Sequence, residues 1–290
     1  MLAAVALLLT PLAARADVIH SEHSLYQNIL VTETAGQRCL QFSVRRDQRN
    51  QSCMDLRDRD RLVFSYTRMM LAGLLLVPEP SRILVVGLGG GSLPTVLARV
   101  YPHAEIDIVE IDPAVVSVAA RFFDFRPSER VRVFEQDARV WGKRAARRPE
   151  RYDLILLDAF NGDYIPEHLM TREYLEETRA LLADRGVVAA NTFAISDLYD
   201  HESATYAAVF GHYFNLTMPD SANRVIVASR APLPTLAELE ASASALEGRL
   251  SRFGVEIGDY PSRMSRKRDW REDARILTDQ YAPANLLRER

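Results

Sequence analysis

The sequence predicts an α/β protein in which a doubly wound, mostly parallel sheet follows a small β domain. Three observations lead to this prediction. Short apolar runs alternate with helix-like segments between residues 83 and 190, a glycine-rich segment joins the first run to its helix, and strand-like runs with polar turns precede both. Strands that alternate with helices form parallel sheets with helices on both faces.

The buried strands of this sheet are expected where short apolar runs are bounded by turn residues. These runs are Ile83 to Val86, Ile106 to Val109, Val131 to Phe134, Leu154 to Leu157 and Val187 to Ala190. Helices are expected at Arg61 to Leu76, Leu93 to Val100, Ala114 to Phe123 and Glu173 to Leu182. Phe214 to Met218 and Val225 to Ala228 are separated by turn residues, which suggests an antiparallel pair that closes the sheet.

The predicted organisation has four parts. Residues 1–16 form a signal peptide, 17–60 a β-strand domain, 61–230 a nucleotide-binding catalytic domain, and 231–290 a charged, helical segment. The 290 residues are enough for one substantial core and a smaller satellite. A formal net charge of −3 does not indicate a nucleic-acid partner.

The N-terminus predicts export to the periplasm. The apolar run Leu2 to Leu12 is too short to span a bilayer comfortably, and it ends in the cleavage pattern Ala14-Arg15-Ala16. The segment before the run carries no Lys or Arg. A membrane-tethered segment, a start site that omits an upstream membrane domain, and a cytoplasmic protein therefore remain alternatives.

The two cysteines, Cys39 and Cys53, flank a polar segment centred on Arg46. Alternating apolar residues before this segment predict a β-hairpin, and a symmetric hairpin would place the cysteines opposite each other. Facing residues in such a pair lie within disulfide range, and a disulfide would agree with export. Two small buried thiols are the equally weighted alternative.

The glycine-rich segment Val85 to Ser92 lies between a strand and a helix, where glycines allow a tight turn and close approach of backbone to a ligand. We expect Gly87, Gly89 and Gly91 to serve a bound nucleotide in this way. Glu110 ends the second strand, where a carboxylate can accept hydrogen bonds from both ribose hydroxyls. The segment lacks the Walker lysine and the G-x-G-x-x-G pattern with a phosphate site, which favours a nucleotide without a phosphate chain.

Two further carboxylates follow buried strands. Asp137 comes after the third strand and would reach an adenine amino group, although an N-cap of the next helix is a serious alternative. Asp158 ends the fourth strand, and ligands of such sheets bind beyond the carboxyl ends of the strands. We therefore expect Asp158 to face the same crevice as the nucleotide.

Taken in order, these segments resemble the spermidine synthase (polyamine aminopropyltransferase) family, of which the chain looks like a divergent member. The matching segments are Tyr26-Gln27, Phe64-Ser65-Tyr66 with Met69, the glycine-rich loop, Val109 to Asp112, Asp137-Ala138, Tyr152-Asp153 and Asp158. The resemblance covers most of Ser21 to Arg230 and implies a Rossmann-like fold of the class I methyltransferase type. It also implies a transferase of polyamine biosynthesis and makes a homodimer plausible.

By this resemblance, Gln27, Glu110, Asp137 and Ala138 contact the nucleoside of decarboxylated S-adenosylmethionine, and no metal is required. Asp158 is the general base that takes a proton from a small-molecule amine acceptor, because a protonated amine cannot attack. Tyr66 helps to line the amine channel. The family reaction transfers the aminopropyl group to the amine and releases methylthioadenosine.

Two departures from the family pattern weaken this expectation. Gly90 occupies the position of a loop aspartate that holds the aminopropyl ammonium group, and Asn161 replaces a second aspartate, although Asp163 lies close by as a substitute. The loop also resembles related methyltransferases that use intact S-adenosylmethionine. A methyltransferase and an exported, non-catalytic binding protein with the same fold are the alternatives.

Overall fold

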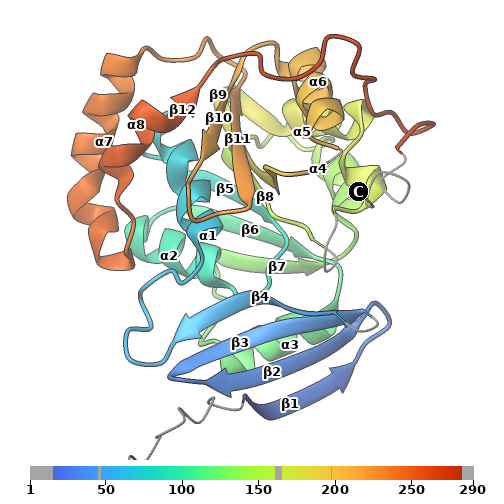
Figure 1. Ribbon diagram of the computed structural model, residues 1–290, viewed down its shortest axis with the longest axis vertical. Coiled ribbons are helices and arrows are strands. Elements are labelled where there is room, and N and C mark those ends of the chain that lie inside the picture. Colours follow the sequence, from blue (N-terminus) through green and yellow to red (C-terminus); the bar gives the residue numbers. More distant parts are fainter. Residues whose placement is uncertain (1–15, 45–46, 161–164, 197, 283–290) are drawn as a thin grey trace, which may run out of the picture.

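Two β-sheets of different kinds organise the chain in the computed structural model, which describes residues 16–44, 47–160, 165–196 and 198–282 (Figure 1). The smaller sheet contains the N-terminal strands, and the larger one contains the remaining strands with helices on both faces. This arrangement confirms the predicted α/β class with an N-terminal β domain. Of the residues that the structure describes, none belongs to a helix long and apolar enough to cross a membrane.

The smaller sheet is an antiparallel meander of four strands in chain order. Its strands are β1 (Asp17–His23), β2 (Asn28–Thr34), β3 (Gln37–Val44) and β4 (Asp47–Asp55). Ala35 and Gly36 join β2 to β3 with φ angles of 52° and 83°, as a tight hairpin turn requires. Side chains that alternate along β2 and β3, such as Ile29, Val31 and Leu40, are fully buried in the main core.

The larger sheet has eight strands in the order β12-β10-β11-β9-β8-β5-β6-β7. Its parallel part comprises β5 (Arg82–Val86), β6 (Glu105–Glu110), β7 (Val131–Glu135), β8 (Tyr152–Leu157) and β9 (Leu182–Phe193). The antiparallel strands are β10 (Tyr213–Thr217), β11 (Asn223–Ser229) and β12 (Met264–Ser265). The strand order reverses beside β5, where ligands of open α/β sheets bind.

Helices cover both faces of this sheet (Figure 1). One face carries α1 (Ser65–Met70), η1 (Leu71–Leu75), α2 (Ser92–Val100), α3 (Pro113–Phe122) and α7 (Leu236–Leu250). The other carries α4 (Ala138–Ala145), α5 (Arg172–Leu181) and α6 (Tyr199–Phe210). The shorter helices are η2 (Glu167–Leu169), η3 (Ser251–Phe253), η4 (Ile257–Asp259) and α8 (Tyr260–Arg263). Successive residues of β5 and β8 alternate between the two cores, which explains their continuous apolar runs.

The structure corrects the predicted helix at residues 61–76. Arg61 to Phe64 are not helical; the backbone N–H of Leu62 donates instead to the carbonyl of Phe253 at 3.0 Å. The α-helix begins at Ser65 and continues as a 3₁₀ segment after Met70. Apolar spacing could not reveal this change, because every residue from Leu71 to Leu75 is buried.

The C-terminal segment is helical over only part of its predicted length. A capping box formed by Thr235 and Glu238 begins α7, and two 3₁₀ turns and the short α8 follow it. From Met264 onward the described chain is mostly irregular, and its fully buried Leu277 packs against Met170. The prediction of a helical segment is therefore wrong for residues 264–282, and residues 283–290 lie outside the described residues.

Candidate active site

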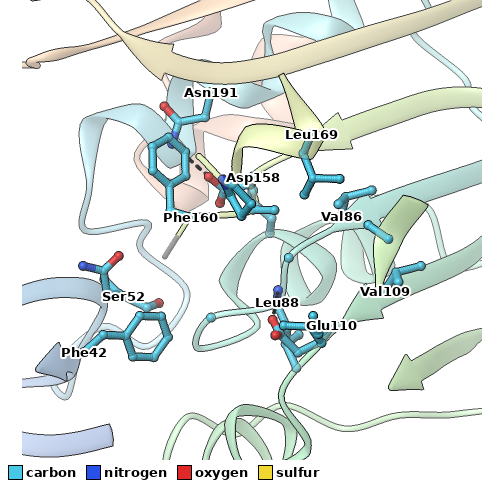
Figure 2. Close-up of a pocket in the computed structure, with 18 of the residues that line it drawn as sticks. Phe42, Ser52, Val86, Leu88, Val109, Glu110, Asp158, Phe160, Leu169 and Asn191 are labelled. Carbon is cyan, nitrogen blue, oxygen red and sulfur yellow. Dashed lines mark hydrogen bonds between the residues drawn. The ribbon is translucent and has the colours of Figure 1, made fainter. Parts of the chain in front are cut away.

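A cavity of about 430 Å³ lies where the carboxyl ends of the parallel strands face β4 of the smaller sheet (Figure 2). Most of the predicted site residues line it: Gln27, Tyr66, Gly87, Gly89, Glu110, Asp137, Ala138 and Asp158. The structure therefore brings together side chains that are separated by up to 131 positions in the sequence. Asn161 and Asp163, predicted as substrate residues, lie outside the described residues.

The glycine-rich loop allows two strands to approach each other at the cavity. Gly87 has a φ of 95°, and a Cβ there would lie 2.4 Å from the backbone carbonyl oxygen of Asp158. Gly91 is not among the residues that line the cavity. Its φ of 77° places it as the N-cap of α2, and a Cβ would lie 2.8 Å from the ring of Phe125. Gly91 therefore shapes the loop from behind.

Glu110 braces this loop from the end of β6. Its carboxylate accepts hydrogen bonds from the backbone N–H of Leu88 at 2.9 Å and of Asp112 at 3.0 Å. Burial raises the pKa of Glu110, and these backbone hydrogen bonds oppose that effect. A carboxylate has about four lone-pair sites, so the group retains capacity to accept hydroxyl donors from a ligand.

Asp137 caps the following helix, which was the alternative to its binding a ligand. One of its oxygens accepts from the backbone N–H of Val140 at 2.8 Å, which caps α4. The other lies 2.8 Å from Nε2 of His168, a residue of η2 that also lines the cavity. The N-cap interpretation is therefore correct, and contact with an adenine amino group stays a prediction for the same carboxylate.

Asp158 follows β8 directly and points into the cavity (Figure 2). Its Oδ1 accepts a hydrogen bond from Nδ2 of Asn191 at 2.8 Å. Burial raises the pKa of Asp158 to about 7, while the hydrogen bond from Asn191 opposes the rise. The carboxyl group therefore titrates close to neutral pH, as a general base that exchanges protons with a substrate requires.

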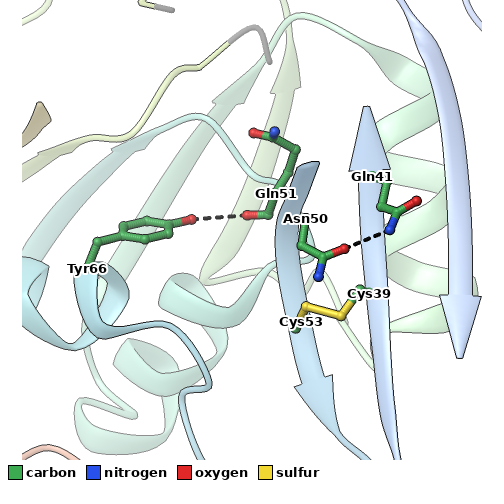
Figure 3. The surroundings of a disulfide bond; sticks show 6 residues. All are labelled: Cys39, Gln41, Asn50, Gln51, Cys53 and Tyr66. Carbon is green, nitrogen blue, oxygen red and sulfur yellow. Dashed lines mark hydrogen bonds between the residues drawn. A yellow bond between two sulfur atoms is a disulfide. The ribbon is translucent and has the colours of Figure 1, made fainter. Parts of the chain in front are cut away.

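Tyr66 reaches the cavity from α1, and its hydroxyl donates to the backbone carbonyl of Gln51 at 3.1 Å (Figure 3). Burial raises its pKa well above the ordinary value, and the negative charge of Asp158 adds to the effect. The phenol stays protonated at neutral pH. It therefore fixes β4 against α1 and contributes an aromatic wall near Asp158.

The disulfide Cys39–Cys53 joins β3 to β4, the strand to which the hydroxyl of Tyr66 donates (Figure 3). The two residues are direct partners in the antiparallel register, with Cα atoms 4.1 Å apart, which confirms the predicted facing pair. Asn50, Gln51 and Ser52, immediately before Cys53, all line the cavity. The disulfide therefore anchors the strand that forms one side of the site.

Gly90 leaves no room for a larger side chain. A Cβ at this position would lie 2.7 Å from Oγ of Ser52 and 3.1 Å from the ring of Phe123. Ser52 is buried and lines the cavity. Its hydroxyl thus occupies the space into which a loop carboxylate at position 90 would extend. The glycine that replaces the family's loop aspartate therefore fits the position of Ser52.

Several lining residues were not predicted from the sequence. Asn191 and Phe193 come from the end of β9, Asn223 from the start of β11, and Phe160 from the segment after Asp158. Asn191 carries a usable signal, because it lies near the carboxyl end of a predicted parallel strand. His168 and Ser52 carry no such signal, since no pattern in their segments places them near the carboxyl ends of the parallel strands.

The lining has a chemical character that limits its ligands. Within the described residues it has three carboxylates, Glu110, Asp137 and Asp158, and no lysine or arginine. Such a cavity favours a cation over an anion. In the same described part of the chain, no group of three or more His, Cys, Asp or Glu residues could hold a metal ion.

Comparisons with known proteins agree with this architecture. The spermine/spermidine synthase domain matches residues 63–226. A polyamine aminopropyltransferase of Vibrio vulnificus is 52% identical over 97% of this chain and 95% of its own length. A crystal structure of a probable spermidine synthase from Corynebacterium glutamicum shares the fold, with a TM-score of 0.71 at 22% identity over 91% of this chain and 97% of that one.

Human methyltransferase-like protein 13, solved in complex with SAH, is also similar. It has a TM-score of 0.60 at 27% identity and covers 77% of this chain and 100% of that chain. The Rossmann-like fold of methyltransferase type, with an N-terminal antiparallel sheet, is thus shared with both classes of transferase. Because the domain match spans more than half of the sequence and the Vibrio relative matches nearly all of it, the chain belongs to the spermine/spermidine synthase family.

Proposed function

We propose that this protein is a polyamine aminopropyltransferase, which moves the aminopropyl group of decarboxylated S-adenosylmethionine to an amine acceptor. The observation that carries the proposal is Asp158, a cavity-facing carboxylate beside the glycine-rich loop with a pKa of about 7. The 52% identity to a relative named for this activity supports it. The absence of lysine and arginine from the described lining suits a sulfonium donor and an ammonium acceptor.

The proposed reaction needs a neutral amine and an in-line approach. Asp158 accepts a proton from the acceptor ammonium group, and the freed nitrogen lone pair attacks the aminopropyl carbon next to the sulfonium. A new C–N bond forms as the C–S bond breaks, and the electron pair of that bond stays on sulfur, which leaves as methylthioadenosine. Glu110 and the glycine-rich loop hold the nucleoside so that carbon and nitrogen are aligned.

We expect incubation with decarboxylated S-adenosylmethionine and a panel of di- and polyamines to yield an aminopropylated product together with methylthioadenosine. Mass spectrometry of the products checks this. Controls lack either the protein or the amine. Nucleoside binding without a product from any donor would favour the non-catalytic alternative instead.

A methyltransferase is the second candidate, favoured by Gly90 and by the similarity to methyltransferase-like protein 13. Without a carboxylate at position 90, the loop could tolerate the carboxylate of intact S-adenosylmethionine. The same assay with that donor separates the two functions, because a methyl and an aminopropyl group add different masses to the amine. A methylated product would replace the first proposal.

We also propose that the protein is exported, with a mature N-terminus at Asp17. The Ala14-Arg15-Ala16 pattern and the disulfide Cys39–Cys53 support this, since disulfides persist in oxidising compartments. Intact-mass analysis of protein from native cells should give the mass of residues 17–290 less two hydrogens. Alkylation without prior reduction should add no mass. A retained Met1 with two alkylated thiols would contradict both parts of the proposal.

A further inference from the structure

Two asparagine side chains form a hydrogen-bonded chain that ends on Asp158. Nδ2 of Asn223 donates to Oδ1 of Asn191 at 2.9 Å, and Nδ2 of Asn191 donates to Oδ1 of Asp158 at 2.8 Å. The three residues lie on β11, on β9 and directly after β8, which are adjacent in the sheet. Figure 2 shows the amide of Asn191 directed at the Asp158 carboxylate.

The chain has a direction because each amide has a donor end and an acceptor end. Asn191 is only 4% exposed, so its amide depends on neighbouring groups for its hydrogen bonds. The side-chain N–H of Asn223 donates to the oxygen of Asn191, so the nitrogen of Asn191 faces Asp158. A reversed amide would place oxygen lone pairs against the carboxylate. Asn223 therefore fixes the orientation in which Asn191 supports the ionised base.

The opposite face of the same two strands fixes their register. Arg224 pairs with Thr192 across β11 and β9, and its Nε donates to Oγ1 of Thr192 at 2.8 Å. Arg224 is fully buried, and it also donates to Oγ of Ser203 at 2.7 Å and forms an ion pair with Glu202. Successive residues of a strand point to opposite faces. This network therefore holds the backbone positions from which the two asparagines reach the cavity.

We propose that Asn191 and Asn223 are positioning residues that hold Asp158 by one oxygen and leave the other free to take the proton of the amine. The proposal rests on the proposed function, because it assigns these residues to the base of that reaction. Within the described residues, Oδ2 of Asp158 has no hydrogen-bond partner, whereas Oδ1 accepts from Asn191. The asparagine pair thus determines which oxygen faces the substrate.

Other titratable groups share the cavity with Asp158. Tyr66 on α1 interacts with it electrostatically, and Glu110 at the end of β6 and the Asp137–His168 pair also line the cavity. The hydrogen bond from Asn191 is the interaction that lowers the pKa of Asp158 against the effect of burial. Losing this bond therefore raises that pKa, and the ionised base appears only at higher pH.

The experiment follows the carboxyl carbon-13 NMR signal of Asp158 against pH in the full chain with methylthioadenosine present, assigned by its disappearance in Asp158→Asn. Asn191→Leu should move the titration midpoint upward by about one pH unit, the effect of losing a hydrogen bond to a charged group. Asn223→Ala should move it in the same direction by less. The double variant should not exceed Asn191→Leu, because Asn223 acts through Asn191.

Asn223→Asp keeps the size of the side chain and serves as a second variant if Asn191→Leu does not fold. Its ionised carboxylate cannot donate to Asn191 and adds a negative charge near Asp158, so the midpoint should rise by more than in Asn223→Ala. Asn215→Ala is the matched control, since Asn215 is a buried asparagine on β10 of the same sheet and does not line the cavity. Its midpoint should equal that of the wild type.

An unchanged midpoint in folded Asn191→Leu would overturn the proposal, and so would additive effects in the double variant. Melting temperature and methylthioadenosine affinity identify the folded variants. The titration needs no turnover, so it remains informative if the wild type yields no aminopropylated product. That result would refute the proposed function alone. Where turnover is observed, kcat should be measured against pH with one acceptor amine throughout. The pH at which kcat falls on the acid side should then shift together with the NMR midpoint.

Discussion

Asp158→Asn should reduce aminopropyl turnover by about 10²–10⁴-fold, the range expected when a general base is lost. The substitution keeps the shape of the side chain and removes the oxygen that takes the proton. Methylthioadenosine affinity should stay near that of the wild type, because the nucleoside site proposed at Glu110 and the glycine-rich loop lies on other strands. Single-turnover rates and equilibrium binding measure the two quantities separately.

The pH dependence follows from the raised pKa of Asp158. A base with a pKa of about 7 is ionised above that pH, so wild-type kcat should fall as the pH falls through 7. The same shift bears on stability with a defined sign. An aspartate whose folded pKa exceeds its unfolded value favours folding at low pH and loses that contribution as pH rises through the folded pKa. Asp158→Asn should therefore melt no lower than the wild type at pH 8.

Asp153→Asn is the matched control, because it makes the same change near the other end of β8. Its carboxylate accepts hydrogen bonds from the backbone N–H groups of Ser81 and Arg82 at 2.8 and 3.0 Å, away from the cavity. We expect a lower melting temperature with kcat unchanged. Near-wild-type turnover in Asp158→Asn would show that another group takes the proton.

The sequence predicts those elements best whose local pattern agrees with their tertiary environment. The strands of the parallel sheet are buried on both faces, so their apolar runs identify them without knowledge of their partners. The helix α6 was missed because its buried side chains include the polar residues Glu202, Ser203 and Thr205. Glu202 and Ser203 bind Arg224 from a distant strand, and Thr205 accepts from the backbone N–H of Leu277; local periodicity cannot reveal such partners.

The same limit applies to the site. Glu110, Asp137 and Asp158 could be predicted because each ends or follows a parallel strand, and such strand ends meet at one edge of the sheet. Asn223 could not, since it begins an antiparallel strand and reaches the cavity only because β11 pairs with β9. The side of the cavity that β4 forms could not be predicted either. It depends on how the two sheets pack together, and strand patterns give no indication of that packing.

Glu110→Ala should abolish the rise in melting temperature that methylthioadenosine gives the wild-type protein. In the proposed site the carboxylate would support the nucleoside in two ways: it accepts from the N–H of Leu88 within the glycine-rich loop, and it retains lone pairs that ribose hydroxyls would use. Losing hydrogen bonds to a charged group of this kind weakens binding by about 10- to 100-fold. Thermal shift over a ligand titration, followed by calorimetry, measures the loss.

Glu105→Ala provides the comparison, because Glu105 begins the strand that Glu110 ends and forms surface ion pairs with Arg82 and Arg132. Exposed pairs of this kind contribute little to stability, so its melting temperature and its response to methylthioadenosine should stay close to wild type. Equal ligand-induced shifts in Glu110→Ala and Glu105→Ala would remove Glu110 from the nucleoside site. Glu110 would then only stabilise the glycine-rich loop. A shift lost only in Glu110→Ala, with the unliganded protein still folded, would place the ribose at the end of β6.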